Sequence, residues 1–306
     1  MNACRKLLPD GRWHFQHGPM DLILQVEGER DAVAQAHERA WHRFEGLLQE
    51  LVDELPGLRA PVGDRCVLQG AVARRMWEAC APYRAGFITS MAAVAGAVAQ
   101  EILAGYDQPG IDRAWVNNGG DIALHLAPGQ SVTVGVYADI AALSAAQLHS
   151  GLVLDGKIRV TSAMPVRGVA TSGWRGRSQS LGIADSVTVL ARTAAQADAA
   201  ATIVANAVNV QDARIGRMPA CLVRDDSDLG AIPVTVDVPA LPEGQVRRAL
   251  QQGLQKAQEL QSGGLLWFAL LACQGQFVAT AAPEAIAGAK WPAEWVTESE
   301  VGSVFA

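Results

Sequence analysis

The chain has 306 residues, of which 50% are hydrophobic and only 18% are charged, with 25 Lys and Arg against 31 Asp and Glu. This composition excludes a disordered chain, because disorder requires low hydrophobicity and a high content of charge. The net charge of −6 argues against a nucleic-acid-binding protein, since such proteins need clustered Lys and Arg to meet the phosphate backbone.

The first half of the chain alternates between segments with helical and with strand-like spacing of apolar residues. The clearest helix runs from Asp31 to about Glu54, where apolar side chains recur every three or four residues. We predict, in chain order, a strand over Leu22–Val26, that long helix, a short helix over Ala71–Ala81, a helix from Thr89 or Ser90 to Leu103, and strands over Ala114–Asn117, Ile122–Leu126 and Val132–Tyr137.

The second half predicts more strands around another alanine-rich helix. The elements are strands over Leu152–Val160, Val166–Ala170 and Ser186–Ala191, a helix from Thr193 or Ala194 to about Val208, a proline-punctuated loop over 233–242, a helix over Gln245–Leu260, and strands over Leu265–Ala272 and Gln276–Thr280. The apolar run Leu265–Cys273 is half of the ~20 residues that a membrane helix needs. The N-terminus lacks the apolar stretch of a secretory signal. We therefore expect a soluble, cytoplasmic protein with no membrane partner.

Helices and strands are mixed without a regular βαβ alternation, and this favours the α+β class. The two alanine-rich helices, 90–103 and 194–208, each lie near a glycine-rich turn and several strands, which suggests two similar halves. Because no linker or composition break divides the chain, we predict one domain over 1–306. Its core would cover about 18–280, and 281–306 would form a C-terminal extension.

The five cysteines are widely spaced and form no CxxC pair, so neither a disulfide framework nor a zinc site is indicated. We expect reduced and mostly buried thiols, as in a cytosolic protein. They are Cys4, Cys66, Cys80, Cys221 and Cys273.

The helix from Thr193 to Val208 carries a single charge, Asp198. Asp198 and Thr202 are one turn apart and share a helix face, which continues to Asn206. A carboxylate and a hydroxyl in this arrangement supply two hard oxygens, which suit Mg²⁺ better than zinc. The plain alternative is a polar stripe that faces water, but such a stripe usually carries several Lys or Glu.

Two glycine-containing segments at strand ends could approach a ligand closely. Asn118-Gly119-Gly120-Asp121 permits positive φ and close backbone approach, although an ordinary hairpin turn has the same residues. Ala170-Thr171-Ser172-Gly173 offers N–H groups and two hydroxyls to an anion, although such residues are also common in turns.

In their order and content these three segments resemble the signature of the ApbE-like superfamily, whose best-known members are FAD:protein FMN transferases. The GGD segment matches Asn118–Asp121, the ATSG segment matches 170–173, and the AD-x-x-AT helix motif matches Ala197–Thr202. The resemblance implies an ApbE-like, T-fold-like domain with mixed or antiparallel sheets and a pseudo-duplicated interior. It also implies that Asp198 and Thr202 bind the catalytic Mg²⁺ beside the FAD pyrophosphate, with the two glycine-containing segments contacting the cofactor.

The chain departs from the transferases at two places. Their aspartate-led segment ending AKG corresponds to Met91–Ala97, which has neither the aspartate nor the lysine. Their histidine after ATSG is absent from Ser178–Asp185. Both segments, and the closing helix and strands over 246–280, resemble a branch of uncharacterised ApbE-like proteins.

Two further residues are candidates beside the ATSG segment. Arg175 follows it directly and could hold a phosphate or a carboxylate, with a solvated loop as the equal alternative. Asp185 precedes a predicted strand and is a third catalytic candidate, because it could line the same cleft.

Two functional classes remain open. The first is a Mg²⁺-dependent enzyme that acts on a flavin nucleotide or another phosphorylated or anionic small molecule. The second is a metabolite-binding or pathway-accessory protein without flavin transferase activity. A small-molecule ligand is expected in both, and a homodimer stays open.

Overall fold

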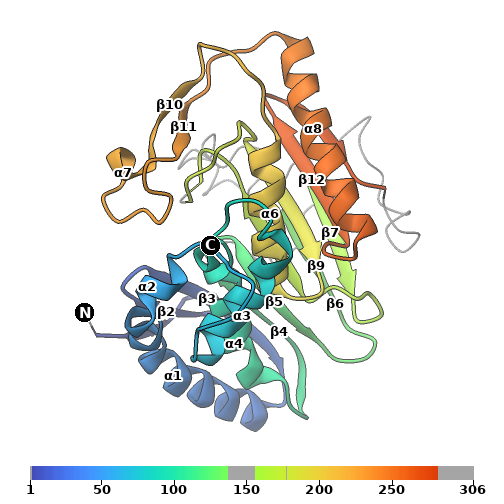
Figure 1. Ribbon diagram of the computed structural model, residues 1–306. Helices are drawn as coiled ribbons and strands as arrows, with labels where there is room; N and C mark the ends of the chain where they lie inside the picture. The colour runs from blue at the N-terminus through green and yellow to red at the C-terminus, as the bar shows by residue number, and fades with distance from the viewer. Residues whose placement is uncertain (1, 137–155, 177, 282–306) are drawn as a thin grey trace.

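A computed structural model describes residues 2–136, 156–176 and 178–281 of the chain, and its centre is a nine-stranded sheet (Figure 1). Neighbouring strands in the order β1-β2-β3-β4-β5-β8-β9-β12-β13 are all antiparallel. The strands are β1 (Cys4–Leu7), β2 (Trp13–His17), β3 (Met20–Gly28), β4 (Ile111–Asn118), β5 (Asp121–Leu126), β8 (Gly168–Ser172), β9 (Ser186–Ala191), β12 (Phe268–Cys273) and β13 (Gln276–Ala279).

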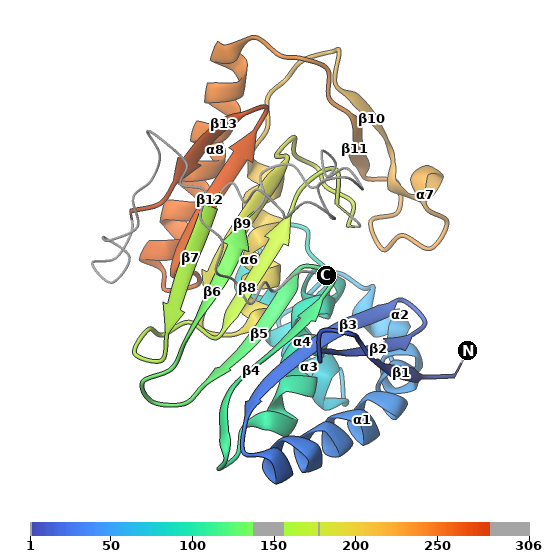
Figure 2. The same cartoon turned by 180° about the vertical axis from the view of Figure 1, so that it is seen from behind.

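Helices cover one face of this sheet, as Figure 1 shows. They are α1 (Arg30–Asp53), α3 (Ala71–Cys80), α4 (Val94–Leu103), α6 (Ala194–Ala207) and α8 (Glu243–Ser262), with the short α2 (Leu55–Leu58) and the 3₁₀ helices Ala81–Tyr83, η2 (Ser90–Ala93) and Ala104–Tyr106. The hairpin of β6 (Ser131–Val136) and β7 (Gly156–Thr161) lies on the other face (Figure 2). There Val134 and Ile158 pack in one apolar cluster with sheet residues such as Leu124.

The alanine-rich composition of α6 has a structural reason. Its alanines at 194, 195, 197 and 199–201 are all buried against α4 and the sheet. Small side chains permit such close packing on several sides of one helix. Figure 1 places α4 over β4 and β5 and α6 over β8 and β9, so each alanine-rich helix covers its own strand pair. This confirms the predicted α+β class and its pair of similar halves.

The structure differs from the predictions in three places. Two strands, β1 and β2, precede the predicted core and join the main sheet. The predicted helix from Ser90 is a 3₁₀ helix up to Ala93 before α4 begins. The predicted loop around Pro233 contains β11 (Pro233–Asp237), which pairs with β10 (Gly216–Pro219). Proline is tolerated there because it is the first residue of a strand in a two-stranded ribbon.

The other predicted elements agree to within a few residues, except that Tyr137 and 152–155 lie outside the described residues. Within the described ranges, no helix combines the length and the apolar character that crossing a membrane demands.

Candidate functional site

The turn between β4 and β5 forms one wall of the candidate site. Gly119 and Gly120 have φ of +66° and +110°, values that glycine adopts most readily. This two-residue turn brings Asn118 opposite Asp121, and both side chains are largely buried. Asn118 Nδ2 donates to Ala95 O at 3.2 Å, so the turn is attached to the start of α4.

Asp198 on α6 faces the same N-terminal turn of α4. The backbone N–H of Gly96 donates to Asp198 Oδ2 at 2.9 Å, and Ala95 provides a second backbone hydrogen bond. The two helices cross closely here: a Cβ on Gly96 would lie only 2.3 Å from Ala194 O. Free N–H groups at a helix N-terminus favour a negative charge, so this contact orients the carboxylate.

Asp121 and Asp198 form an interacting pair of carboxylates. Burial raises the pKa of Asp198 to about 7, although its hydrogen bonds from Gly96 and Ala95 act in the opposite direction. Burial and the negative charge of Asp198 raise the pKa of Asp121 well above its ordinary value, against a hydrogen bond from Thr171 N at 3.2 Å. Ionising both groups together is therefore costly without a bound positive charge.

The first three residues of the ATSG segment, Ala170 to Ser172, form the end of β8, and Gly173 follows the strand. Ala170 is buried beneath α6, and Thr171 reaches Asp121 through its N–H while its Oγ1 lies 3.1 Å from Thr188 Oγ1. Ser172 pairs with Val187 in the sheet. Gly173 is needed for close packing, because a Cβ there would lie 2.4 Å from Asp185 O.

Thr202 lies one turn beyond Asp198 on α6 and is partly buried. Further along that face, Asn206 Oδ1 accepts from Leu181 N at 2.9 Å. The polar face of α6 therefore begins at Asp198, in the carboxylate pair, and ends at Asn206, whose side chain stabilises the loop at Leu181.

Asp185 and Arg175 are gathered in a second group around Trp174. Trp174 Nε1 donates to Asp185 Oδ1 at 3.3 Å, and Arg175 Nε lies 3.9 Å from the same oxygen. Gln274 N donates to Asp185 Oδ2 at 2.5 Å, which ties the carboxylate to the β12–β13 turn. These contacts are typical of a residue that stabilises loops, and a catalytic role for Asp185 stays a prediction.

Asp228, which the sequence did not single out, contacts Thr89. Burial and the negative charges of Asp198 and Asp228 together raise the pKa of Cys80. Thr89 Oγ1 also donates to Asp228 Oδ2. Thr89 is the residue directly before η2, which leads into α4. No motif marks Asp228, because it comes close only through the fold.

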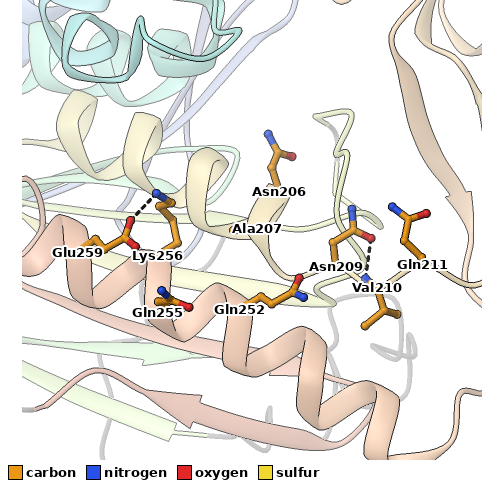
Figure 3. Close-up of a pocket in the computed structure, with 9 residues that line it drawn as sticks. All are labelled: Asn206, Ala207, Asn209, Val210, Gln211, Gln252, Gln255, Lys256 and Glu259. Atoms are coloured by element: carbon orange, nitrogen blue, oxygen red, sulfur yellow. Dashed lines mark hydrogen bonds and ion pairs between the residues drawn. The ribbon is translucent and has the colours of Figure 1, made fainter.

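A cavity of about 530 Å³ lies at the other end of α6 (Figure 3). Asn206 and Asp198 are eight residues apart, or about 12 Å along a helix. Figure 3 shows Asn206 directed away from α8 and Lys256 paired with Glu259. The lining residues are mostly carboxamides, namely Asn206, Asn209, Gln211, Gln252 and Gln255. Asp121 and Asp198, the two carboxylates whose pKa burial raises, do not line this cavity, so we place the candidate site at these two residues.

Over the ranges that the structure describes, no three His, Cys, Asp or Glu side chains gather in a way that could hold a metal ion. The candidate site therefore offers two carboxylates and not a complete set of protein ligands.

Comparison with known proteins gives the family. The family model described as "AbpE bacteria" matches residues 5–279. A UPF0280 protein of Methanopyrus kandleri is 33% identical over 210 residues, covering 67% of this chain and 78% of that protein. A UPF0280 protein of Methanothermobacter thermautotrophicus is 42% identical over 123 residues, covering 40% of this chain and 43% of that protein.

Among solved structures, the apo form of the Pseudomonas stutzeri flavinyl transferase ApbE aligns with a TM-score of 0.47 and 12% identity, over 94% of this chain and 97% of that one. The family assignment depends on the sequence matches alone. With a match to nearly its full length, the chain belongs to the ApbE-like proteins, in the family described as AbpE bacteria.

Proposed function

We propose that this protein binds a flavin nucleotide together with Mg²⁺ at Asp121 and Asp198, and that it acts as an FMN transferase of ApbE type. The observation that carries the proposal is the pair of carboxylates held between α4, α6 and the β4–β5 turn. The resemblance of the three sequence segments to the transferases supplies the class of ligand.

The residues present fit Mg²⁺. Asp121, Asp198 and the hydroxyl of Thr202 are hard oxygen donors, and Mg²⁺ is usually held by one or two carboxylates plus substrate phosphates. Burial raises the pKa of both carboxyl groups, and a cation bound between them would favour their ionised forms. When bound, Mg²⁺ would neutralise the pyrophosphate and favour departure of AMP.

The remaining parts of the site would position the nucleotide. The N–H groups of Gly96 and Ala95 orient Asp198, and Thr171 N orients Asp121. The turn at Gly119 and Gly120 leaves space for a ligand, since nothing lies within 4 Å of a Cβ built on Gly120. In the transfer, an acceptor hydroxyl oxygen would form a bond to the phosphorus on the flavin side of the FAD pyrophosphate. The P–O bond to AMP would break, AMP would leave, and the hydroxyl proton would pass to solvent.

A metabolite-binding role without transfer is the second candidate. It is favoured by the absence of the transferases' lysine and histidine from Met91–Ala97 and Ser178–Asp185. The close approach of α4 and α6 explains why the lysine is absent. Position 96, which corresponds to the lysine of AKG, has no room for a side chain, because a Cβ there would collide with Ala194.

The test is to incubate the protein with FAD and Mg²⁺ and to follow both FAD binding and AMP release. Asp198→Asn should abolish Mg²⁺-dependent binding, while Asp64→Asn, a change at a side chain that is 91% exposed, should not. Binding without AMP release would favour the metabolite-binding role. If FAD does not bind in the presence of Mg²⁺, the flavin proposal is wrong.

A further inference from the structure

The cavity of about 530 Å³ at the end of α6 is lined by neither Asp121 nor Asp198, and the proposed function does not use it (Figure 3). The cavity lies beside the place where α8 packs on the end of α6. The two segments approach closely there, because a Cβ on Gly253 of α8 would lie 2.3 Å from Val208 Cγ2. The volume of the cavity is within the ~300–1,000 Å³ that small-molecule sites usually occupy.

One wall of the cavity is fixed by hydrogen bonds. Asn209 Nδ2 donates to Leu181 O at 2.9 Å, and Arg217 Nη2 donates to Asn209 Oδ1 at 2.6 Å. Asn206 Oδ1 accepts from Leu181 N at 2.9 Å. These contacts anchor the segment that follows α6, so this wall is in place before a ligand arrives, and binding need not order it. The last carbonyl groups of a helix have no partner within the helix, so the end of α6 also offers hydrogen-bond acceptors.

Three exposed carboxamides complete the lining. Gln252 and Gln255 belong to α8, and Gln211 follows the fixed wall (Figure 3). Because these side chains are exposed, their amide groups can turn toward a ligand without breaking a contact in the core. A carboxamide donates through its nitrogen and accepts through its oxygen, and a hydroxyl group also does both. Each of the three amides can therefore pair with a hydroxyl group in either direction.

The lining disfavours three other classes of ligand. Among the described residues that line the cavity, Lys256 is the one cation and is paired with Glu259, so no unpaired positive charge awaits a phosphate. None of these lining residues is aromatic, so a flat base or flavin ring would have no stacking partner. The apolar part consists of Ala207 and Val210, so an apolar ligand would cover the carboxamides without pairing them. A neutral molecule with several hydroxyl groups fits this lining best.

We propose that the cavity between α6 and α8 binds a neutral polyhydroxyl molecule, a free sugar or polyol, through Gln211, Gln252 and Gln255 against the wall at Asn209. The cavity begins at Asn206, eight residues or about 12 Å along α6 from Asp198. A ligand in the cavity would therefore not touch the carboxylate pair, and the two sites can be occupied independently. The inference does not depend on the proposed function.

The test is a saturation-transfer difference NMR titration of the full chain, with myo-inositol, ribitol and glucose as separate probes. At least one probe should bind to wild type. The double variant Gln252→Ala/Gln255→Ala should bind that probe about tenfold or more weakly, as expected for the loss of two hydrogen bonds. The matched control is Gln251→Ala/Gln258→Ala, which changes two exposed positions of α8 that do not line the cavity and should leave the affinity unchanged. Melting temperatures verify that both variants are folded.

Two further measurements locate the bound probe and check its chemical class. Asp198→Asn should leave the affinity for the probe unchanged, because the carboxylate pair does not line the cavity. Inorganic phosphate should not displace the probe, because Lys256 is already paired. The inference is overturned if no probe binds to wild type, if the two double variants bind the probe equally, if Asp198→Asn abolishes binding, or if phosphate displaces the probe.

Discussion

The N–H of Gly96 and the carboxylate of Asp198 are 2.9 Å apart, although 102 residues separate them in the chain. Their contact depends on the crossing of α4 and α6, where the backbone of Gly96 approaches Ala194 too closely for any side chain. The packing of the two alanine-rich helices and the orientation of the site carboxylate are thus one structural feature.

Gly96→Ala should therefore destabilise the protein. Its Cβ would force α4 and α6 apart, and overpacking of this kind costs about 1–3 kcal/mol. Urea unfolding measures the change. The matched control is Gly46→Ala on the exposed side of α1, where a Cβ meets nothing within 4 Å, and where the better helix former should add about 0.5–1 kcal/mol. Equal effects of the two substitutions would contradict the close crossing.

Asp198→Asn should change how stability depends on pH. The pKa of Asp198 is raised in the folded state, so the unfolded chain loses this proton at a lower pH. The contribution of this carboxyl group to the free energy of unfolding is then fully present below the ordinary aspartate pKa, and it is lost as the pH rises through about 7. Without Mg²⁺, the melting temperature of wild type should fall more between about pH 5 and about pH 8 than that of Asp198→Asn. If the melting temperatures of wild type and Asp198→Asn change with pH in parallel, the pKa of Asp198 is not raised.

Thr202→Val should weaken Mg²⁺ binding without a loss of stability. The substitution keeps the shape of the side chain and removes the proposed ligand oxygen, so affinity should fall about tenfold or more. Isothermal titration calorimetry measures the affinity. Thr193→Val is the control on the same helix: it removes the N-cap contact to Gln196 N and should cost about 1 kcal/mol of stability with unchanged Mg²⁺ binding. Unaltered affinity in Thr202→Val would remove Thr202 from the proposed site.

Asp185→Ala distinguishes a structural from a catalytic aspartate. Loss of the carboxylate leaves Gln274 N and the Trp174 indole without their acceptor, which should cost about 2 kcal/mol. Urea unfolding, FAD binding and AMP release are measured on the same preparation, and only the stability should change. A variant of normal stability that no longer releases AMP would instead support the catalytic prediction.

Much of the fold was predictable from local patterns. The long α1 and α8 have apolar residues at helical spacing, and β9 has the predicted bounds of Ser186–Ala191. The segments at 118–121 and 170–173 were predictable as strand ends, because their glycines and small polar residues mark turns. Their gathering with Asp198 was implied by the resemblance to ApbE-like proteins and not by any spacing in the sequence.

Other features depended on long-range contacts. β1 and β2 are short, and they form strands because β3 provides a paired edge. The innermost paired residues of β10 and β11, Pro219 and Pro233, are fourteen positions apart and are both prolines, so local propensity pointed to a loop. Asp228 has no motif around it, and its contact with Thr89 joins residues 139 positions apart.

The sequence by itself determined the α+β class, most of the helices, the family, and the residue types that could serve a Mg²⁺ and nucleotide site, because these follow from periodicity and short motifs. Only the tertiary structure decided that Asp198 is oriented by the N–H of Gly96, that Asp121 is its partner, and that Asp185 contacts Trp174 and the β12–β13 turn. The physical reason is that pKa shifts and charge coupling depend on burial and on distances through space, which the order of residues along the chain does not contain.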